Sequence, residues 1–193
     1  MELFLSHPSV DVNKYNKSNV TPLMLAVSSN IAENVCALLE YQDIDLSSVY
    51  ENGLTQLHLA AAAGMVEKMQ KILNRNSRSS TITVDVNKQD SDGYTALPYA
   101  VSKRQEECVK MLLEVKEIDV NIRAYDGYTP LHIAVELKEV EIIRLLLTHK
   151  QIDVNIPDKF GCTPLALTRK YFIPNKKIVW LLIRHGATDK KSH

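Results

Sequence analysis

A threonine at the predicted start of a helix recurs along this chain at a nearly constant interval. It stands at Thr21, Thr55, Thr95, Thr129 and Thr163, so the intervals are 34, 40, 34 and 34 residues. A period of this length predicts one supersecondary unit that is stacked repeatedly and shares its core with its neighbours. Repeat arrays of this kind bind along a surface, and we expect no single catalytic pocket.

Each period contains the same three segments. A turn with glycine leads into a short helix, as in residues 126–134, which read Asp-Gly-Tyr-Thr-Pro-Leu-His-Ile-Ala. Glycine tolerates a positive φ at the turn, the threonine hydroxyl caps the helix, and proline suits the first helical position. A second helical stretch ends in an apolar cluster such as 145–147, and a β-branched Ile-Asp-Val-Asn segment such as 152–155 follows. The order predicts helix pairs joined by extended hairpins.

These motifs resemble the ankyrin repeat, which includes the pattern Thr-Pro-Leu-His-x-Ala. The resemblance recurs five times and covers nearly the whole chain. It implies an all-α solenoid of about five full helix-turn-helix units with hairpin fingers, plus a partial N-terminal unit. The expected single domain, 1–193, divides into a partial repeat 1–13, a tail 190–193 and the repeats 14–47, 48–87, 88–121, 122–155 and 156–189.

Three departures from the pattern stand out. The chain opens inside a unit, which fits either a short natural start or a stretch cut from a longer array. The interval of 40 residues places an insertion within 74–83, where a polar Ser/Arg-rich run predicts a loop. This loop is either a tolerated surface insertion or a regulated or partner-contacting segment. The C-terminal end is basic and has Asp189 as its one acid, so it is either a solvated cap or a docking site for an acidic partner or phosphate. Its cations are Arg169, Lys170, Lys176, Lys177, Arg184, Lys190 and Lys191.

The expected helix start varies at its fourth position, where histidine is present only as His58 and His132. The resemblance implies that these histidines bridge the threonine and neighbouring backbone, a structural role. Pro98 takes this position in one unit, and the cost is small because early helical amides lack helical partners. Cys108 is expected to pack on an apolar helix face.

Nothing in the sequence predicts an enzyme, a metal site or a cofactor. The motifs GxSxG, GxxxxGK[ST], HExxH and GxGxxG are missing, and so is any Cys or His pair at metal-ligand spacing. Lys+Arg and Asp+Glu each total 23, so whole-chain charge predicts no nucleic-acid partner. The three scattered cysteines and the lack of a long apolar run predict a soluble intracellular protein, cytoplasmic or nuclear, with no membrane insertion.

The resemblance implies that a protein partner binds the concave face formed by the fingers and the first helices. We therefore expect a monomeric protein-interaction module that acts as a scaffold, regulator or effector; the alternatives are a structural spacer or a ligand-sensing array of a larger protein. Aromatic residues at the outward positions either contact the partner or brace adjacent fingers. The candidate partner-binding residues are Tyr15, Tyr94, Lys103, Arg123, Tyr125, Tyr128, Glu136, Leu137, Phe160 and Tyr171.

A further hypothesis concerns three asparagines that end an Asp-Val-Asn segment. Asn13, Asn121 and Asn155 each follow a leucine by eight residues. This context resembles that of asparagine β-hydroxylation in ankyrin repeats, so these three side chains are candidate modification sites.

Overall fold

The computed structural model describes residues 11–17, 20–28, 34, 37–38, 52–74, 84–170 and 175–188, and all regular structure in these residues is helical. The expected all-α class is thereby confirmed. The predicted loop at 75–83, Tyr171 and the tail lie outside the described residues. The helices are α2 (Pro22–Ser28), α4 (Gln56–Ala63), α5 (Val66–Asn74), α6 (Ala96–Ser102), α7 (Glu106–Leu113), α8 (Pro130–Glu136), α9 (Val140–Leu147), α10 (Pro164–Arg169) and α11 (Lys176–Arg184).

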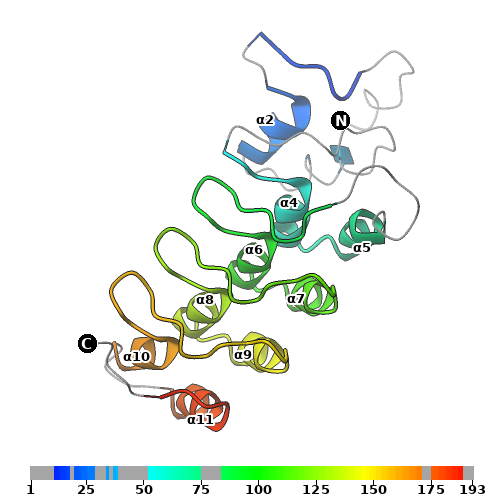
Figure 1. Ribbon diagram of the computed structural model, residues 1–193. Coiled ribbons are helices and arrows are strands. Elements are labelled where there is room, and N and C mark those ends of the chain that lie inside the picture. Colours follow the sequence, from blue (N-terminus) through cyan, green and yellow to red (C-terminus); the bar gives the residue numbers. More distant parts are fainter. Residues whose placement is uncertain are drawn as a thin grey trace.

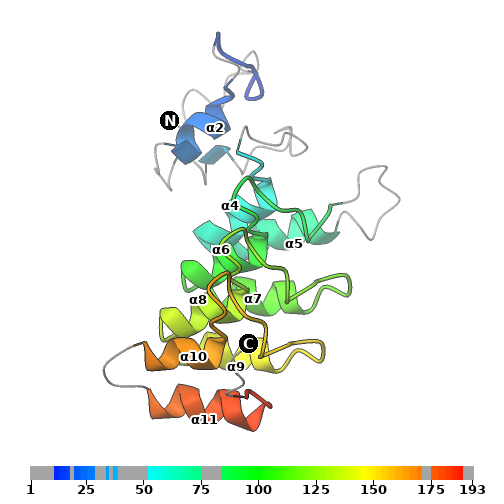
Figure 2. The ribbon, with the colours of Figure 1, turned by 60° about the vertical axis from the view of Figure 1, so that its left-hand side comes forward.

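The helices form two parallel columns. Helices α4, α6, α8 and α10 stack as one column of first helices, and α5, α7, α9 and α11 stack beside it as a column of second helices (Figure 1). Extended loops project beyond the first column before α6, α8 and α10 (Figures 1 and 2). Each of these three helices therefore has a finger at its N-terminal end and a second helix along its other side, which is the arrangement expected from the sequence.

Small and branched side chains alternate through the core. Ala60, Ala100 and Ala134 are fully buried, and the absence of a long side chain lets successive first helices approach closely. Leu112 of α7 and Leu146 of α9 belong to the second column and are fully buried in the same core. The core runs without a break through the described stack from Leu57 to Ala187, as nearest-neighbour stacking requires.

The helix starts follow the predicted chemistry. The Thr129 hydroxyl accepts a hydrogen bond from the backbone N–H of His132 at 3.5 Å, and Thr163 accepts one from Ala166 at 3.3 Å. Thr95 has no such bond, because Pro98 is the third residue of α6 and carries no N–H. As predicted, Pro98 lies in the first turn of the helix, where backbone N–H groups have no partner within the helix.

Each finger is a tight turn that needs glycine at one position. In the finger of residues 90–94, Gly93 N–H donates to the Asp90 carbonyl at 3.1 Å and Asp90 N–H donates to the Tyr94 carbonyl at 2.9 Å. Gly93 and Gly127 both have φ 84°, which other residues adopt only with strain. The predicted positive φ is confirmed at these tips.

Candidate binding surface on the fingers

Neighbouring fingers are joined by their backbones. Tyr125 N–H donates to the Asp92 carbonyl at 2.9 Å, and Lys159 N–H donates to the Asp126 carbonyl at 3.1 Å. Gly127 lies so close to the next finger that an added Cβ would be 2.7 Å from the Asp158 carbonyl carbon. The finger tips of successive units are thus held side by side at a defined spacing.

Two aromatic side chains stand out from these tips. Tyr125 is 75% exposed and Phe160 is 78% exposed. They lie on adjacent fingers, Tyr125 two residues before the turn glycine and Phe160 one residue before it. The Lys159 ammonium lies 5.1 Å from the centre of the Phe160 ring, a distance typical of a cation–π contact. Large apolar rings that are this exposed on a rigid backbone form a surface that a partner can cover.

Two other predicted aromatic residues are engaged inside the stack. The Tyr94 hydroxyl donates to Asp126 Oδ2 at 2.5 Å, which ties one finger to the next. The Tyr128 ring stacks on the His132 ring with centroids 5.3 Å apart and an interplanar angle of 26°. Both tyrosines are half-buried, so their contacts in this structure are those of the bracing alternative.

A buried carboxylate organises the finger of residues 90–94. Asp90 Oδ1 accepts hydrogen bonds from the N–H groups of Asp92 and Tyr94, each at 2.9 Å, and Oδ2 accepts one from the Tyr99 hydroxyl at 2.7 Å. Desolvation, followed by the hydrogen bonds to Asp126 and Asp90, raises the pKa values of Tyr94 and Tyr99. Both hydroxyls therefore stay protonated and donate. Sequence reasoning did not single out Tyr99; the signal was an aromatic residue where the other units have Leu or Ile.

The two histidines of the helix starts are structural, as the resemblance implied. His132 Nδ1 accepts from the Thr129 N–H at 3.1 Å, and its Nε2 lies 3.1 Å from the Cys162 carbonyl of the next finger. His58 makes the same bridge between Thr55 and the Tyr94 carbonyl. Burial is the largest effect on both rings and lowers their pKa below 6.5, so the neutral form, with the proton on Nε2, is the form that binds.

The remaining candidate residues are spread along the stack. Arg123 is exposed beside the finger tips, whereas Lys103, Glu136 and Leu137 lie at the C-terminal ends of α6 and α8. A seven-residue helix rises about 10 Å, so these three are a helix length away from the tips. Tyr15 is 48% exposed in the N-terminal part. The cluster that the structure brings together is therefore Tyr125, Phe160, Lys159 and Arg123.

The asparagines of the Asp-Val-Asn segments connect neighbouring units. Asn121 Nδ2 donates to the Gln151 carbonyl at 2.6 Å, and Asn121 Oδ1 accepts from the Asp153 N–H at 2.9 Å. Asn155 makes the same pair of contacts with Gly186 and Thr188. β-Hydroxylation would leave the side-chain amide intact, so these contacts are chemically compatible with the modification hypothesis.

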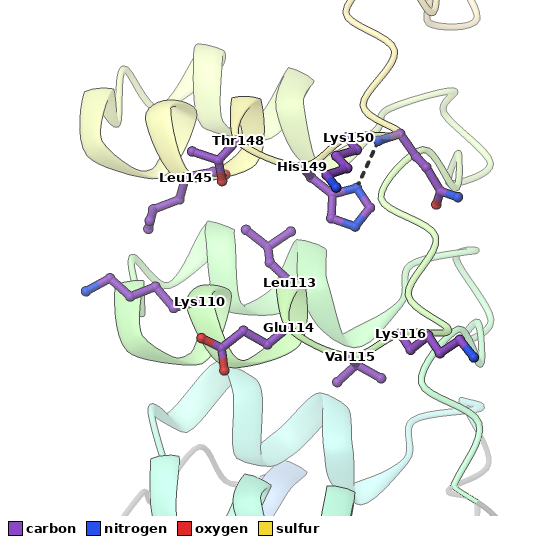
Figure 3. Close-up of a pocket in the computed structure, with 10 residues that line it drawn as sticks. Lys110, Leu113, Glu114, Val115, Lys116, Leu145, Thr148, His149 and Lys150 are labelled. Carbon is purple, nitrogen blue, oxygen red and sulfur yellow. Dashed lines mark hydrogen bonds between the residues drawn. The ribbon is translucent and has the colours of Figure 1, made fainter.

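A groove lies away from the fingers, in the column of second helices. This groove, of about 680 Å³, opens between the C-terminal halves of α7 and α9, and Leu113 and Leu145 project into the gap between these helices (Figure 3). Lys116, Lys150 and Glu114 are among its lining residues and are exposed. None of the predicted site residues within the described ranges lines this outer groove.

The potential metal ligands and thiols of the described residues are dispersed. No group of three His, Cys, Asp or Glu side chains gathers there as a metal site. Cys108 is buried, as predicted, and burial raises the pKa of its thiol with a further contribution from Glu107. No helix in the described part of the chain is long and apolar enough to cross a membrane.

Comparison with known proteins gives one family. Residues 42–124 and 116–192 match the family model described as ankyrin repeats (3 copies). The chain is 32% identical over 93 residues to alpha-latrotoxin-Lhe1a of Latrodectus hesperus, 33% over 102 residues to alpha-latrotoxin-Lg1a of Latrodectus geometricus, and 31% over 93 residues to alpha-latrotoxin-Lt1a of Latrodectus tredecimguttatus. These matches cover 48–52% of this chain but only 6–7% of the relatives.

Proposed function

The chain belongs to the ankyrin-repeat family, and from that premise we propose that it is an interaction module whose finger tips bind a protein segment. Ankyrin repeats generally mediate protein–protein interaction and are generally not enzymes. The observation that carries the proposal is the pair of exposed rings on adjacent fingers, Tyr125 and Phe160. Tyrosine and other large side chains contribute strongly at binding hot spots because they bury much area on a partner.

The fingers are also rigid enough to support binding. The cross-finger hydrogen bonds and the close approach at Gly127 hold the tips before a partner arrives. A preorganised surface loses less conformational entropy on binding, so more of the contact energy appears as affinity. Arg123 and Lys159 are exposed on the same two fingers and add positive charge near the rings. A spacer would have no use for exposed rings at these positions.

We extend the proposal to the number of repeats, the oligomeric state and the cellular location. The array consists of about five full units with a partial N-terminal unit, divided as the sequence predicts. It works as a monomer without a cofactor in the cytoplasm or nucleus, where three scattered thiols stay reduced. Tyr94 and Tyr128 support the surface from within, while Lys103, Glu136, Leu137 and Tyr15 extend it along the side expected to be concave.

Photo-crosslinking in the source cell tests the proposal. A benzophenone amino acid is placed at Tyr125, at Phe160 or, as the matched control on the outer groove, at Lys150. We expect one protein to be captured from the first two positions and not from the third. The double variant Tyr125→Ala/Phe160→Ala should reduce co-purification of that protein by about tenfold or more, since two hot-spot rings are lost.

The variant avoids Tyr128 because that ring stacks on His132 and its loss would change stability as well as binding. Circular dichroism and the urea midpoint should match those of the unaltered protein. Capture that is equal at all three positions, or co-purification that survives loss of both rings, would count against the finger surface.

A further inference from the structure

The C-terminal end of the stack differs in charge from the rest. Residues 159–188 contain six Lys or Arg and no Asp or Glu, whereas residues 84–158 contain nine Lys or Arg and 14 Asp or Glu. Asp158, which precedes this stretch, is buried at the base of its finger and bonded to the N–H groups of Phe160 and Cys162. The positive charge at this end therefore has few local carboxylates to balance it.

Helix α11 gathers part of that charge around an apolar strip. Ile178, Leu181 and Leu182 face the stack and are buried, while Trp180 and Ile183 on the other side are 52% and 55% exposed. Figure 2 shows α11 as the outermost helix at this end. The strip therefore faces away from α9 and α10.

Cations stand at both ends of the strip. Arg184 holds its guanidinium 5.0 Å from the centre of the Trp180 ring, and Lys176 lies one turn before Trp180 on the same side of the helix. Lys177 reaches Glu141 at 3.7 Å, but Arg144 approaches the same carboxylate oxygen at 3.7 Å. These exposed contacts neutralise the end only weakly.

We propose that this α11 face, defined by Lys176, Trp180, Ile183 and Arg184, binds an acidic protein segment that carries a large apolar side chain between carboxylates. The apolar side chain packs on the Trp180 ring and Ile183, and the carboxylates pair with Lys176 and Arg184. Charge complementarity selects the acidic partner. A protein segment fits better than a bilayer, because two exposed apolar side chains bounded by cations provide little area for insertion.

This site is separate from the finger tips and can be tested without knowing either natural partner. Trp180 is the only tryptophan of the chain, so its emission reports directly on this face. The probe is a fluorescein-labelled peptide, Glu-Asp-Glu-Leu-Leu-Glu-Asp-Glu, at 50 mM salt. We expect saturable peptide anisotropy with a shift of Trp180 emission to shorter wavelength, and weaker binding at 300 mM salt because exposed charges are screened.

The variant Lys176→Glu/Arg184→Glu should weaken peptide binding at least about tenfold, through repulsion of the carboxylates. The matched control Lys116→Glu/Lys150→Glu makes the same change in total charge on the outer groove and should alter binding less than about twofold. The finger variant Tyr125→Ala/Phe160→Ala should bind the peptide normally, so failure of one site is distinguishable from failure of the other. The neutral variant Lys176→Gln/Arg184→Gln gives a second reading if the charge reversal unfolds α11.

Four results would overturn the proposal. The first is no peptide binding by the unaltered protein, and the second is equal weakening by the α11 and outer-groove variants. The third is an emission shift with phosphatidylserine vesicles but not with peptide, which would assign the face to an anionic membrane. The fourth is an emission shift and faster sedimentation on raising protein concentration alone, which would assign it to a second copy of the chain.

Discussion

An interior second helix and the last described one occupy equivalent places but have opposite surroundings. Leu147 at the end of α9 and Ile183 at the end of α11 both stand two residues before a histidine, yet Leu147 is 5% exposed and Ile183 is 55% exposed. The glycines of the finger tips differ in the same way. Gly127 abuts the next finger, while Gly161 has no atom within 4 Å of an added Cβ. Leu147 is buried because the following unit covers it, and no described unit covers Ile183 in the same way.

The difference also separates two kinds of surface. Interior side chains pack against a neighbouring repeat of nearly the same shape as their own repeat. The same apolar contacts therefore recur from one pair of repeats to the next. The face of α11 meets solvent and combines cations with Trp180 and Ile183. One repeat pattern can thus bury a side chain where a described neighbour covers it and expose it where none does.

The largest expected contrast is between truncations at the two equivalent positions. Leu147→Ala removes a buried side chain and should destabilise the fold by about 3 kcal/mol, through lost burial and the cavity that remains. Ile183→Ala should cost at most about 0.5 kcal/mol, because its side chain is already half in water. Urea unfolding followed by circular dichroism measures both; equal shifts of the midpoint would mean that α11 is covered in solution.

A second contrast concerns the finger glycines. Gly161→Ala should cost about 1 kcal/mol, the strain of a positive φ for a residue with a Cβ. Gly127→Ala carries the same strain and would also collide with the backbone of Lys159 and Asp158, so we expect about 2 kcal/mol more. Thermal unfolding of the two variants checks this order. A Gly127→Ala protein as stable as the Gly161→Ala protein would show that adjacent fingers can separate freely.

The asparagine contacts should stabilise the interior interface and the last described interface equally, because both interfaces contain them. Asn121→Ala removes two exposed inter-unit hydrogen bonds and Asn155→Ala removes three, and each variant should cost about 1–2 kcal/mol. Native-state hydrogen exchange at the amides of Asp153 and Thr188 reads the two interfaces separately. Loss of protection at one amide but not the other would mean that the last interface is held differently.

The smallest expected effect is a pH dependence of the free energy of unfolding, to which the last described unit should not contribute in this way. Burial lowers the pKa of His58 and His132 in the folded state, so below 6.5 the unfolded chain binds more protons than the folded one. The contribution of these rings to the free energy of unfolding has its full value above that pH. It decreases as the pH falls toward the lowered pKa of the folded state. The last unit has Ala166 at this position and no such group.

Unfolding free energies measured at pH 7.5 and 5.5 test whether stability falls as the pH decreases. The unaltered protein should lose more stability between these values than the variant His58→Gln/His132→Gln, and hydrogen exchange should quicken at α4 and α8 before α10. An identical pH dependence in the variant would show that other groups account for the loss.

Much of the fold could be predicted because the repeat sets local chemistry. Thr129 and Thr163 cap helices, Pro98 costs a cap but no helical hydrogen bond, and Gly93 and Gly127 take a positive φ. The candidate surface was less predictable. Tyr94, Tyr125, Tyr128 and Phe160 shared one outward assignment, yet only Tyr125 and Phe160 are largely exposed. Tyr94 bonds to Asp126 and Tyr128 stacks on His132, and such contacts depend on how side chains meet across a turn or between fingers.

By itself the sequence determined the period, the helix starts, the finger turns and the basic C-terminal stretch. Each of these depends on the backbone preferences or charges of residues close together in the chain, which a sequence displays directly. Only the tertiary structure decided which aromatic rings brace the array and which face solvent, and that Ile183 is uncovered while Leu147 is buried. The exposure of these two side chains depends on a unit about 34 residues further along the chain, so their own sequence context cannot predict it.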